Sequence, residues 1–110
     1  NLYRTKVGDA GLAHLSRLGR LKLLPIGETA VTDVGLVHVA RMTQLEYLGL
    51  RGNRVTDAGL EHVSKLKRLK GLHLGGTAVT DAGIARLAGL EKLEKLWLDG
   101  TPVSNDARPS

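Results

Sequence analysis

The chain has 110 residues, a length typical of one small domain. Hydrophobic residues make up 42% of it and charged residues 25%, which is ordinary for a globular domain, and the formal net charge is +5. Cysteine is absent, which excludes disulfides, thiolate nucleophiles and cysteine-based metal sites. No apolar run reaches the roughly 18 residues of a membrane-spanning helix, and no targeting signal is visible, so the localisation stays unknown.

A pattern with a period of 24 residues runs along the chain. Residues 45–68 and 69–92 are identical at 10 of 24 positions without a gap. The motif Leu-x-x-Leu-x-Leu opens at four positions, the first copy containing a proline and an isoleucine: Leu21, Leu45, Leu69 and Leu93. Because fixed-period self-similarity indicates a repeat architecture, we expect a single domain of about four and a half repeats. The predicted units are 1–20 (partial), 21–44, 45–68, 69–92 and 93–110 (partial).

The apolar spacing changes within each predicted repeat, as the unit 45–68 illustrates. Leu48 and Leu50 alternate with a period of two, which predicts a strand. Further along the unit, apolar residues recur at three-residue steps: Leu60, Val63 and Leu66. This spacing indicates one face of a short helix. Thr56 stands before that helix as an N-cap, and the following aspartate suits the helix dipole. Each repeat is then strand, turn, helix and loop, and its neighbours cover its apolar faces.

Two segments carry a family resemblance: Leu45 to Asn53, and Val55-Thr56-Asp57-Ala58-Gly59-Leu60. With these motifs the chain resembles leucine-rich repeat proteins, specifically the 24-residue class with the Thr-Asp-Ala-Gly-Leu signature. That class occurs in bacterial repeat proteins and is related to ribonuclease-inhibitor-like arrays. The resemblance covers residues 2–104. It implies an α/β fold, a right-handed solenoid with a parallel sheet on the concave side and short helices on the convex side.

The chain departs from the family pattern at two features. Asn53 alone matches the usual asparagine of the turn ladder, and threonine fills the equivalent positions: Thr5, Thr29, Thr77 and Thr101. A hydroxyl can bond the neighbouring turn, so we expect an altered ladder. Pro25 falls on a strand, where its missing N–H should interrupt the sheet pairing locally.

The variable positions that point out of the concave sheet are where such a scaffold displays function. All three aromatic residues of the chain fall in these columns: Tyr3, Tyr47 and Trp97. Tyrosine, tryptophan and arginine are enriched at interface hot spots because they bury large areas and keep a polar group. We therefore expect a non-catalytic module that binds a protein partner through this face. The candidate partner-binding residues are Tyr47, Arg51, His73, Lys95, Trp97 and Asp99.

Other functional classes have less support in the sequence. His14, His38 and His62 occupy one outward column, but helices 8–10 Å apart cannot bring them to one metal, so we expect no metal site and no cofactor. Ser16 and Ser64 follow histidines by two residues, a spacing that turns the side chains apart on a helix, so no enzyme activity is expected.

Two further readings stay open as alternatives. Basic residues gather after the predicted helix C-termini and form an edge that could bind a polyanion, although nucleic acid is not favoured because no aromatics interleave with it. These residues are Arg17, Arg20, Arg41, Lys65, Lys67, Arg68 and Lys92. A structural spacer in a larger repeat protein is the other alternative. The first and last repeats are incomplete, so we expect a fragment of a longer array, with self-association through the ends as the competing explanation.

Overall fold

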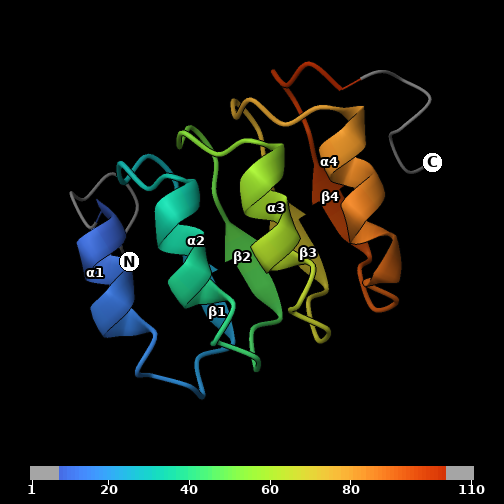
Figure 1. The fold of residues 1–110 in the computed structure, drawn as a ribbon. Helices are drawn as coiled ribbons and strands as arrows, with labels where there is room; N and C mark the ends of the chain where they lie inside the picture. The colour runs from blue at the N-terminus through green and yellow to red at the C-terminus, as the bar shows by residue number, and fades with distance from the viewer. Residues whose placement is uncertain (1–7, 104–110) are drawn as a thin grey trace.

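A computed structural model of the chain describes residues 8–103. Short helices alternate with strands of three residues, and the four strands form one parallel sheet in the order β1-β2-β3-β4. In Figure 1 the helices stand in a row that covers one face of this sheet. The elements are α1 (Gly8–Leu15), β1 (Leu23–Pro25), α2 (Asp33–Val39), β2 (Tyr47–Gly49), α3 (Asp57–Val63), β3 (Gly71–His73), α4 (Asp81–Ala85), the 3-10 helix η1 (Arg86–Gly89) and β4 (Lys95–Trp97).

The core lies between the sheet and the helix row. In the unit 45–68 the predicted apolar columns are all buried, including Leu48 from the strand and Leu60 from the helix. Helix α3 ends at Val63, one turn before the apolar pattern ends, and Leu66 is buried from the loop that follows. The three-residue spacing therefore predicts the buried face correctly but makes the helix too long. The result is an α/β repeat solenoid with its sheet on the concave side.

Threonine begins three of the helices, as the sequence predicts. Thr32 and Thr56 have extended backbones, and their hydroxyl oxygens accept from the N–H groups of Val34 and Ala58 at 3.2 and 3.4 Å. Thr80 has the same backbone conformation at the start of α4 but makes no side-chain cap bond. The N-cap prediction is thus confirmed for α2 and α3.

The aspartate that follows each threonine connects one repeat to the next. The Asp33 carboxylate accepts from the Thr56 backbone N–H at 2.8 Å and from the Thr56 hydroxyl at 2.5 Å. The same pair of bonds joins Asp9 to Thr32 and Asp57 to Thr80. We call this series the Asp–Thr ladder. From the sequence we expect these aspartates only to interact favourably with the helix dipole. The structure shows that they also form hydrogen bonds between repeats.

The asparagine position of the turn behaves differently with asparagine and with threonine. Asn53 Oδ1 accepts from the N–H groups of Thr29 and Val31, both at 3.0 Å, and its Nδ2 donates to the carbonyl of Ile26 at 2.8 Å. The threonine hydroxyls instead donate within their own repeat, Thr29 to Ile26 and Thr77 to Leu74, at 2.6 and 2.7 Å. The expectation that these hydroxyls bond the neighbouring turn is therefore wrong for the described threonines. Thr5 lies outside the described residues.

Pro25 does not interrupt the pairing of β1 with β2. It pairs with Gly49 in register, and the next residue, Ile26, donates its N–H to the Gly49 carbonyl at 3.0 Å. Successive backbone N–H groups of a strand point to opposite sides, so the proline nitrogen faces away from β2. The expected interruption is wrong on this side of the strand because the missing donor was never directed at β2.

Candidate concave-face site

The sheet register aligns the outward positions of the strands in rows. One row contains Tyr47, Gly71 and Lys95, preceded by Leu23, and the next contains His73 beside Trp97. Arg51 and Asp99 stand just beyond β2 and β4. The sequence-predicted residues therefore share one face, and we call them the concave-face cluster: Tyr47, Arg51, His73, Lys95, Trp97 and Asp99. Tyr3, an aromatic of the same predicted columns, lies outside the described residues.

Trp97 is the centre of this cluster. Its ring stacks on the His73 imidazole with centroids 5.4 Å apart and an interplanar angle of 18°. Tyr47 meets the indole edge-on, with centroids 6.3 Å apart and an angle of 74°. Both arrangements are favoured geometries for aromatic pairs. Trp97 nevertheless keeps 39% of its surface exposed, so a large apolar side chain remains accessible on this face.

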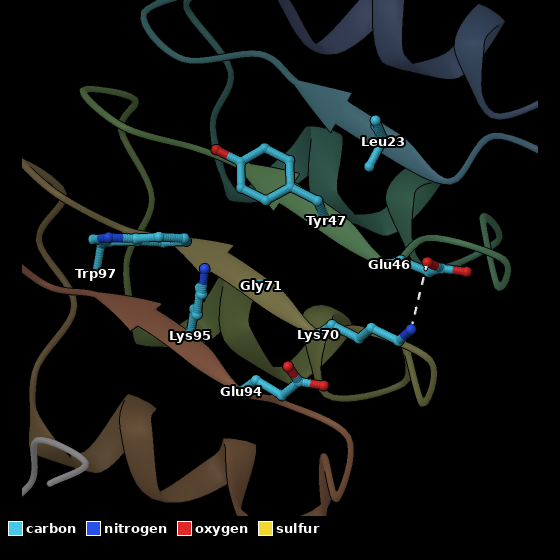
Figure 2. Close-up of a pocket in the computed structure, with 8 residues that line it drawn as sticks. All are labelled: Leu23, Glu46, Tyr47, Lys70, Gly71, Glu94, Lys95 and Trp97. Atoms are coloured by element: carbon cyan, nitrogen blue, oxygen red, sulfur yellow. Dashed lines mark ion pairs between the residues drawn. The ribbon is translucent and has the colours of Figure 1, made fainter.

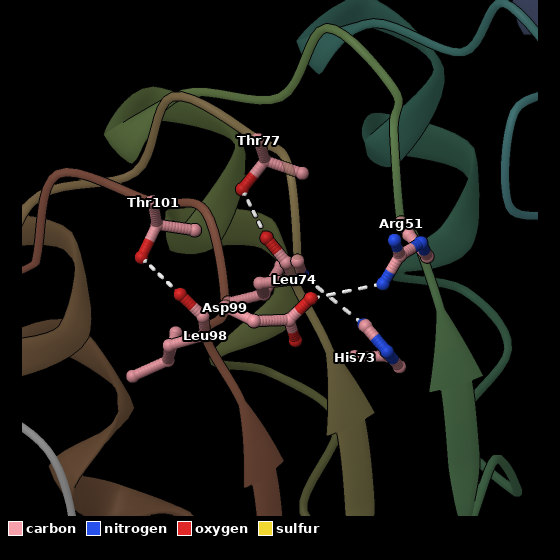
Figure 3. A network of polar contacts seen from close by, with 8 residues as sticks. Arg51, His73, Leu74, Thr77, Leu98, Asp99 and Thr101 are labelled. Carbon is pink, nitrogen blue, oxygen red and sulfur yellow. Dashed lines mark hydrogen bonds and ion pairs between the residues drawn. The ribbon is translucent and has the colours of Figure 1, made fainter.

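Arg51 and Asp99 form an ion pair that crosses β3, as Figure 3 shows. The Arg51 guanidinium donates to Asp99 Oδ2 at 2.9 Å, although the two residues follow strands that are not neighbours, β2 and β4. Gly75 lies between them, and a Cβ placed there would be 2.9 Å from each carboxylate oxygen of Asp99. The missing side chain of Gly75 therefore leaves the space that the pair occupies.

Two other glycines make room for Tyr47. A Cβ on Gly49 would lie 2.7 Å from the Tyr47 hydroxyl oxygen, and one on Gly71 would lie 3.2 Å from Tyr47 Cδ1. The tyrosine ring therefore lies beside two positions that have no side chains of their own. From the sequence alone these glycines suggest a surface with few side chains to contact a partner. In the structure they allow the aromatic ring to lie close to the sheet.

The surroundings of His73 favour its neutral form. Burial lowers the pKa of His73, the nearby Arg51 lowers it further, and Asp99 opposes them. The Nδ1 atom accepts from the Gly75 backbone N–H at 3.1 Å, which only an unprotonated nitrogen can do. Burial also raises the pKa of Tyr47. Near neutral pH the three rings therefore offer an uncharged aromatic surface, flanked by the charges of Arg51, Asp99 and Lys95.

A hollow of 340 Å³ opens beside the aromatic rings and is drawn in Figure 2. The buried Gly71 forms its floor, and an ion pair between Lys70 and Glu46, at 3.8 Å, lies on its rim. The complete lining is Leu23, Glu46, Tyr47, Lys70, Gly71, Glu94, Lys95 and Trp97. Leu23, Gly71 and the rim charges are not among the predicted site residues. Leu23 could have been found, because it stands 24 residues before Tyr47 in the same outward column.

Two solved structures that are similar to this fold are internalins of Listeria monocytogenes. The internalin InlF superposes with a TM-score of 0.76 and 24% sequence identity over 86% of this chain. Internalin C2 superposes with a TM-score of 0.64 and 25% identity over 84% of this chain. The fold is that of a leucine-rich-repeat solenoid. This chain spans 26% of the first internalin chain and 48% of the second. No protein-family model matches the sequence, and no curated protein matches it significantly.

The convex side of this leucine-rich-repeat solenoid holds the histidine column. Residues 8–103 contain no group of three or more histidine, aspartate or glutamate side chains that could hold a metal ion. Within the same range no helix is long and apolar enough to cross a membrane. The chemistry that the described site offers is aromatic stacking, apolar contact and ion pairing.

The predicted basic edge of the solenoid is exposed. Its side chains follow the ends of the helices, as the sequence indicates, and all seven are exposed to solvent: Arg17, Arg20, Arg41, Lys65, Lys67, Arg68 and Lys92. Lys67, Arg68 and Lys92 line a second hollow, of 560 Å³, together with Gly89 and Glu91. Arg68 is partly engaged, since it donates to Gln44 Oε1 at 2.6 Å.

Proposed function

We propose that this solenoid is a non-catalytic module that binds a protein partner through its concave face. The observation that carries the proposal is the position of Trp97, which is stacked on His73, touched by Tyr47 and still 39% exposed. Large exposed aromatic surfaces with charged groups beside them are typical of interface hot spots. Arg51, Asp99 and Lys95 supply such charges here.

The scaffold reduces the entropic cost of binding. Immobilising a free side chain at an interface costs about 0.5–1.5 kcal/mol. The Trp97 and His73 rings are already stacked on each other, and Arg51 is already paired with Asp99. A partner that docks on this face therefore finds most of its contact groups in place, and more of the contact energy appears as affinity.

The test is a selection of binders from a displayed library of protein fragments, followed by affinity measurements on variants. The double variant Tyr47→Ala/Trp97→Ala should weaken binding by about 30-fold or more, the effect of losing a hot spot of about 2 kcal/mol. The matched control is Val34→Ser/Val37→Ser, which removes exposed apolar surface from α2 on the opposite face. Equal weakening by both variants, or retained binding by the first, contradicts the proposal.

A second candidate function is polyanion binding at the basic edge, and the hollow lined by Lys67, Arg68 and Lys92 favours it. Binding of an oligonucleotide or heparin fragment there should weaken steeply between low and moderate salt, because bound counterions are released. Lys67→Glu/Lys92→Glu should abolish it and Tyr47→Ala/Trp97→Ala should not. Failure of both kinds of binding leaves the structural-spacer function for this domain.

A further inference from the structure

The hollow over Gly71 has the chemistry of a socket for one apolar side chain. Its neighbours in the same row are larger, Tyr47 on one side and Lys95 on the other. A Cβ on Gly71 would lie 3.2 Å from Tyr47 Cδ1 and 3.7 Å from Trp97 Cζ3, so both aromatic rings face the space above the glycine. Leu23, with 62% of its surface exposed, extends the apolar lining across β1.

Two acidic and two basic side chains line this hollow, and only some of the charges on this face are paired. Arg51 is paired with Asp99, and Lys70 is paired with Glu46. Within residues 8–103, neither Lys95 nor Glu94 makes an ion pair. Figure 2 shows its side chain rising beside Gly71 toward the indole, while the Glu94 carboxylate lies lower, on the rim near Lys70. The cation that borders the socket is therefore available to an anionic group of a ligand.

We infer that the concave face recognises a protein segment that places an apolar side chain over Gly71 and a carboxylate against Lys95. This inference rests on the proposed function and names the chemistry of its partner. Neighbouring strands are about 4.8 Å apart, so the two sites are separated by about one strand spacing. An extended segment spans that distance in one to two residues of about 3.3 Å each. The partner segment thus carries an aspartate or glutamate one or two positions from a leucine-like residue.

Three capped peptides test the inference directly. They are identical except at two positions and contain Leu-Gly-Asp, Leu-Gly-Lys or Ala-Gly-Asp between glycines. Binding is followed by two-dimensional ¹⁵N NMR at the amides of Gly71 and Lys95 and at the indole N–H of Trp97, which is the single tryptophan of the chain. The Leu-Gly-Asp peptide should shift these signals and bind about three- to fivefold more tightly than the Leu-Gly-Lys peptide, the effect of one exposed ion pair.

Two variants and a control sharpen the test. Lys95→Glu should reverse the preference, so that the lysine peptide binds more tightly than the aspartate peptide. Lys92→Glu makes the same charge change at the basic edge, where Lys92 lines the other hollow, and should leave the preference unchanged. Gly71→Val fills the socket and should abolish the difference between the leucine and alanine peptides. If Gly71→Val does not fold, the charge reversal at position 95 still decides the question.

The failure of this inference is distinguishable from failure of the proposed function. No shift at the three reporter signals up to the solubility limit of the peptides, or a preference that Lys95→Glu leaves unchanged, overturns the inference. If a selected protein partner loses binding with Tyr47→Ala/Trp97→Ala but binds Lys95→Glu as tightly as wild type, the concave-face function holds and the acidic specificity is refuted. If the partner binds the double variant normally, the proposed function itself fails.

Discussion

Replacing Gly59 by alanine should destabilise the solenoid, although helix propensity predicts the opposite. Gly59 lies inside α3, where alanine is favoured over glycine by about 1 kcal/mol. The structure opposes this gain. A Cβ at position 59 would clash with Oδ1 of Asp33 in the preceding repeat, and it would stand 2.7 Å from Leu36 Cδ1. The absence of a side chain at position 59 therefore leaves the space that the Asp33 carboxylate occupies in the Asp–Thr ladder.

The size of the loss follows from what the Asp33 carboxylate does. Displacing it breaks two hydrogen bonds to Thr56, and a bond to a charged group contributes about 1.5–3 kcal/mol. Overpacking beside Leu36 costs about 1–3 kcal/mol more. At the lower end of each range the losses exceed the propensity gain by about 3 kcal/mol. For a domain of this size that corresponds to a decrease in Tm of roughly 12 °C or more.

The assay is thermal and urea unfolding followed by circular dichroism, with Gly19→Ala as the control. A Cβ on Gly19 meets no atom within 4 Å, so that substitution should change the free energy of unfolding by less than about 0.5 kcal/mol. In an Asp33→Ala background the cost of Gly59→Ala should fall sharply, because the carboxylate is no longer in the way. A Gly59→Ala protein that is as stable as wild type would refute the reasoning.

Three further predictions concern other polar groups. Asn53→Thr should lower the free energy of unfolding by about 1–3 kcal/mol in urea titrations, since two backbone N–H groups of the preceding turn lose their acceptor; an unchanged midpoint would contradict this. A double-mutant cycle on Arg51 and Asp99 should give a coupling below about 1 kcal/mol, because both side chains are more than half exposed, and a coupling well above that value would show a structural pair. Because burial lowers the pKa of His73 in the folded state, the unfolded chain binds the proton first, so stability should fall as pH drops below about 6.5 and stay level above it. His73→Gln should flatten the acidic part of that profile, and an unaltered profile would assign the effect elsewhere.

Much of the fold was predictable from the sequence because the repeat multiplies a weak local signal. The alternation of Leu48 and Leu50 is a short pattern, but its recurrence every 24 residues predicts a strand in each repeat. The parallel sheet that the family resemblance implies is confirmed by the pairing of Leu48 with Leu72. The helix ends were less predictable, since Leu66 keeps the apolar spacing while its backbone has already left α3. Burial sets that spacing, whereas hydrogen bonding sets the helix boundary.

The site was predictable as a surface but not as a set of contacts. Outward columns place His73 beside Trp97 from the register alone. The ion pair between Arg51 and Asp99 could not be foreseen, because it depends on the space above Gly75 between two strands that do not touch. The Asp–Thr ladder did leave a signal, since each aspartate precedes its threonine partner by 23 residues. Only the structure shows that residues at this spacing are joined by hydrogen bonds.

The Asp–Thr ladder gives the scaffold and its surface different responses to the loss or duplication of a repeat. Deleting residues 45–68 would place Thr80 against Asp33 in the arrangement that Thr56 has now. The two flanking repeats should therefore still be joined by the Asp–Thr ladder. The same deletion would remove the Tyr47 edge contact from Trp97. Gene-level duplication or loss of whole repeats therefore preserves the Asp–Thr ladder, whereas the proposed binding surface depends on the number and order of the units that carry it.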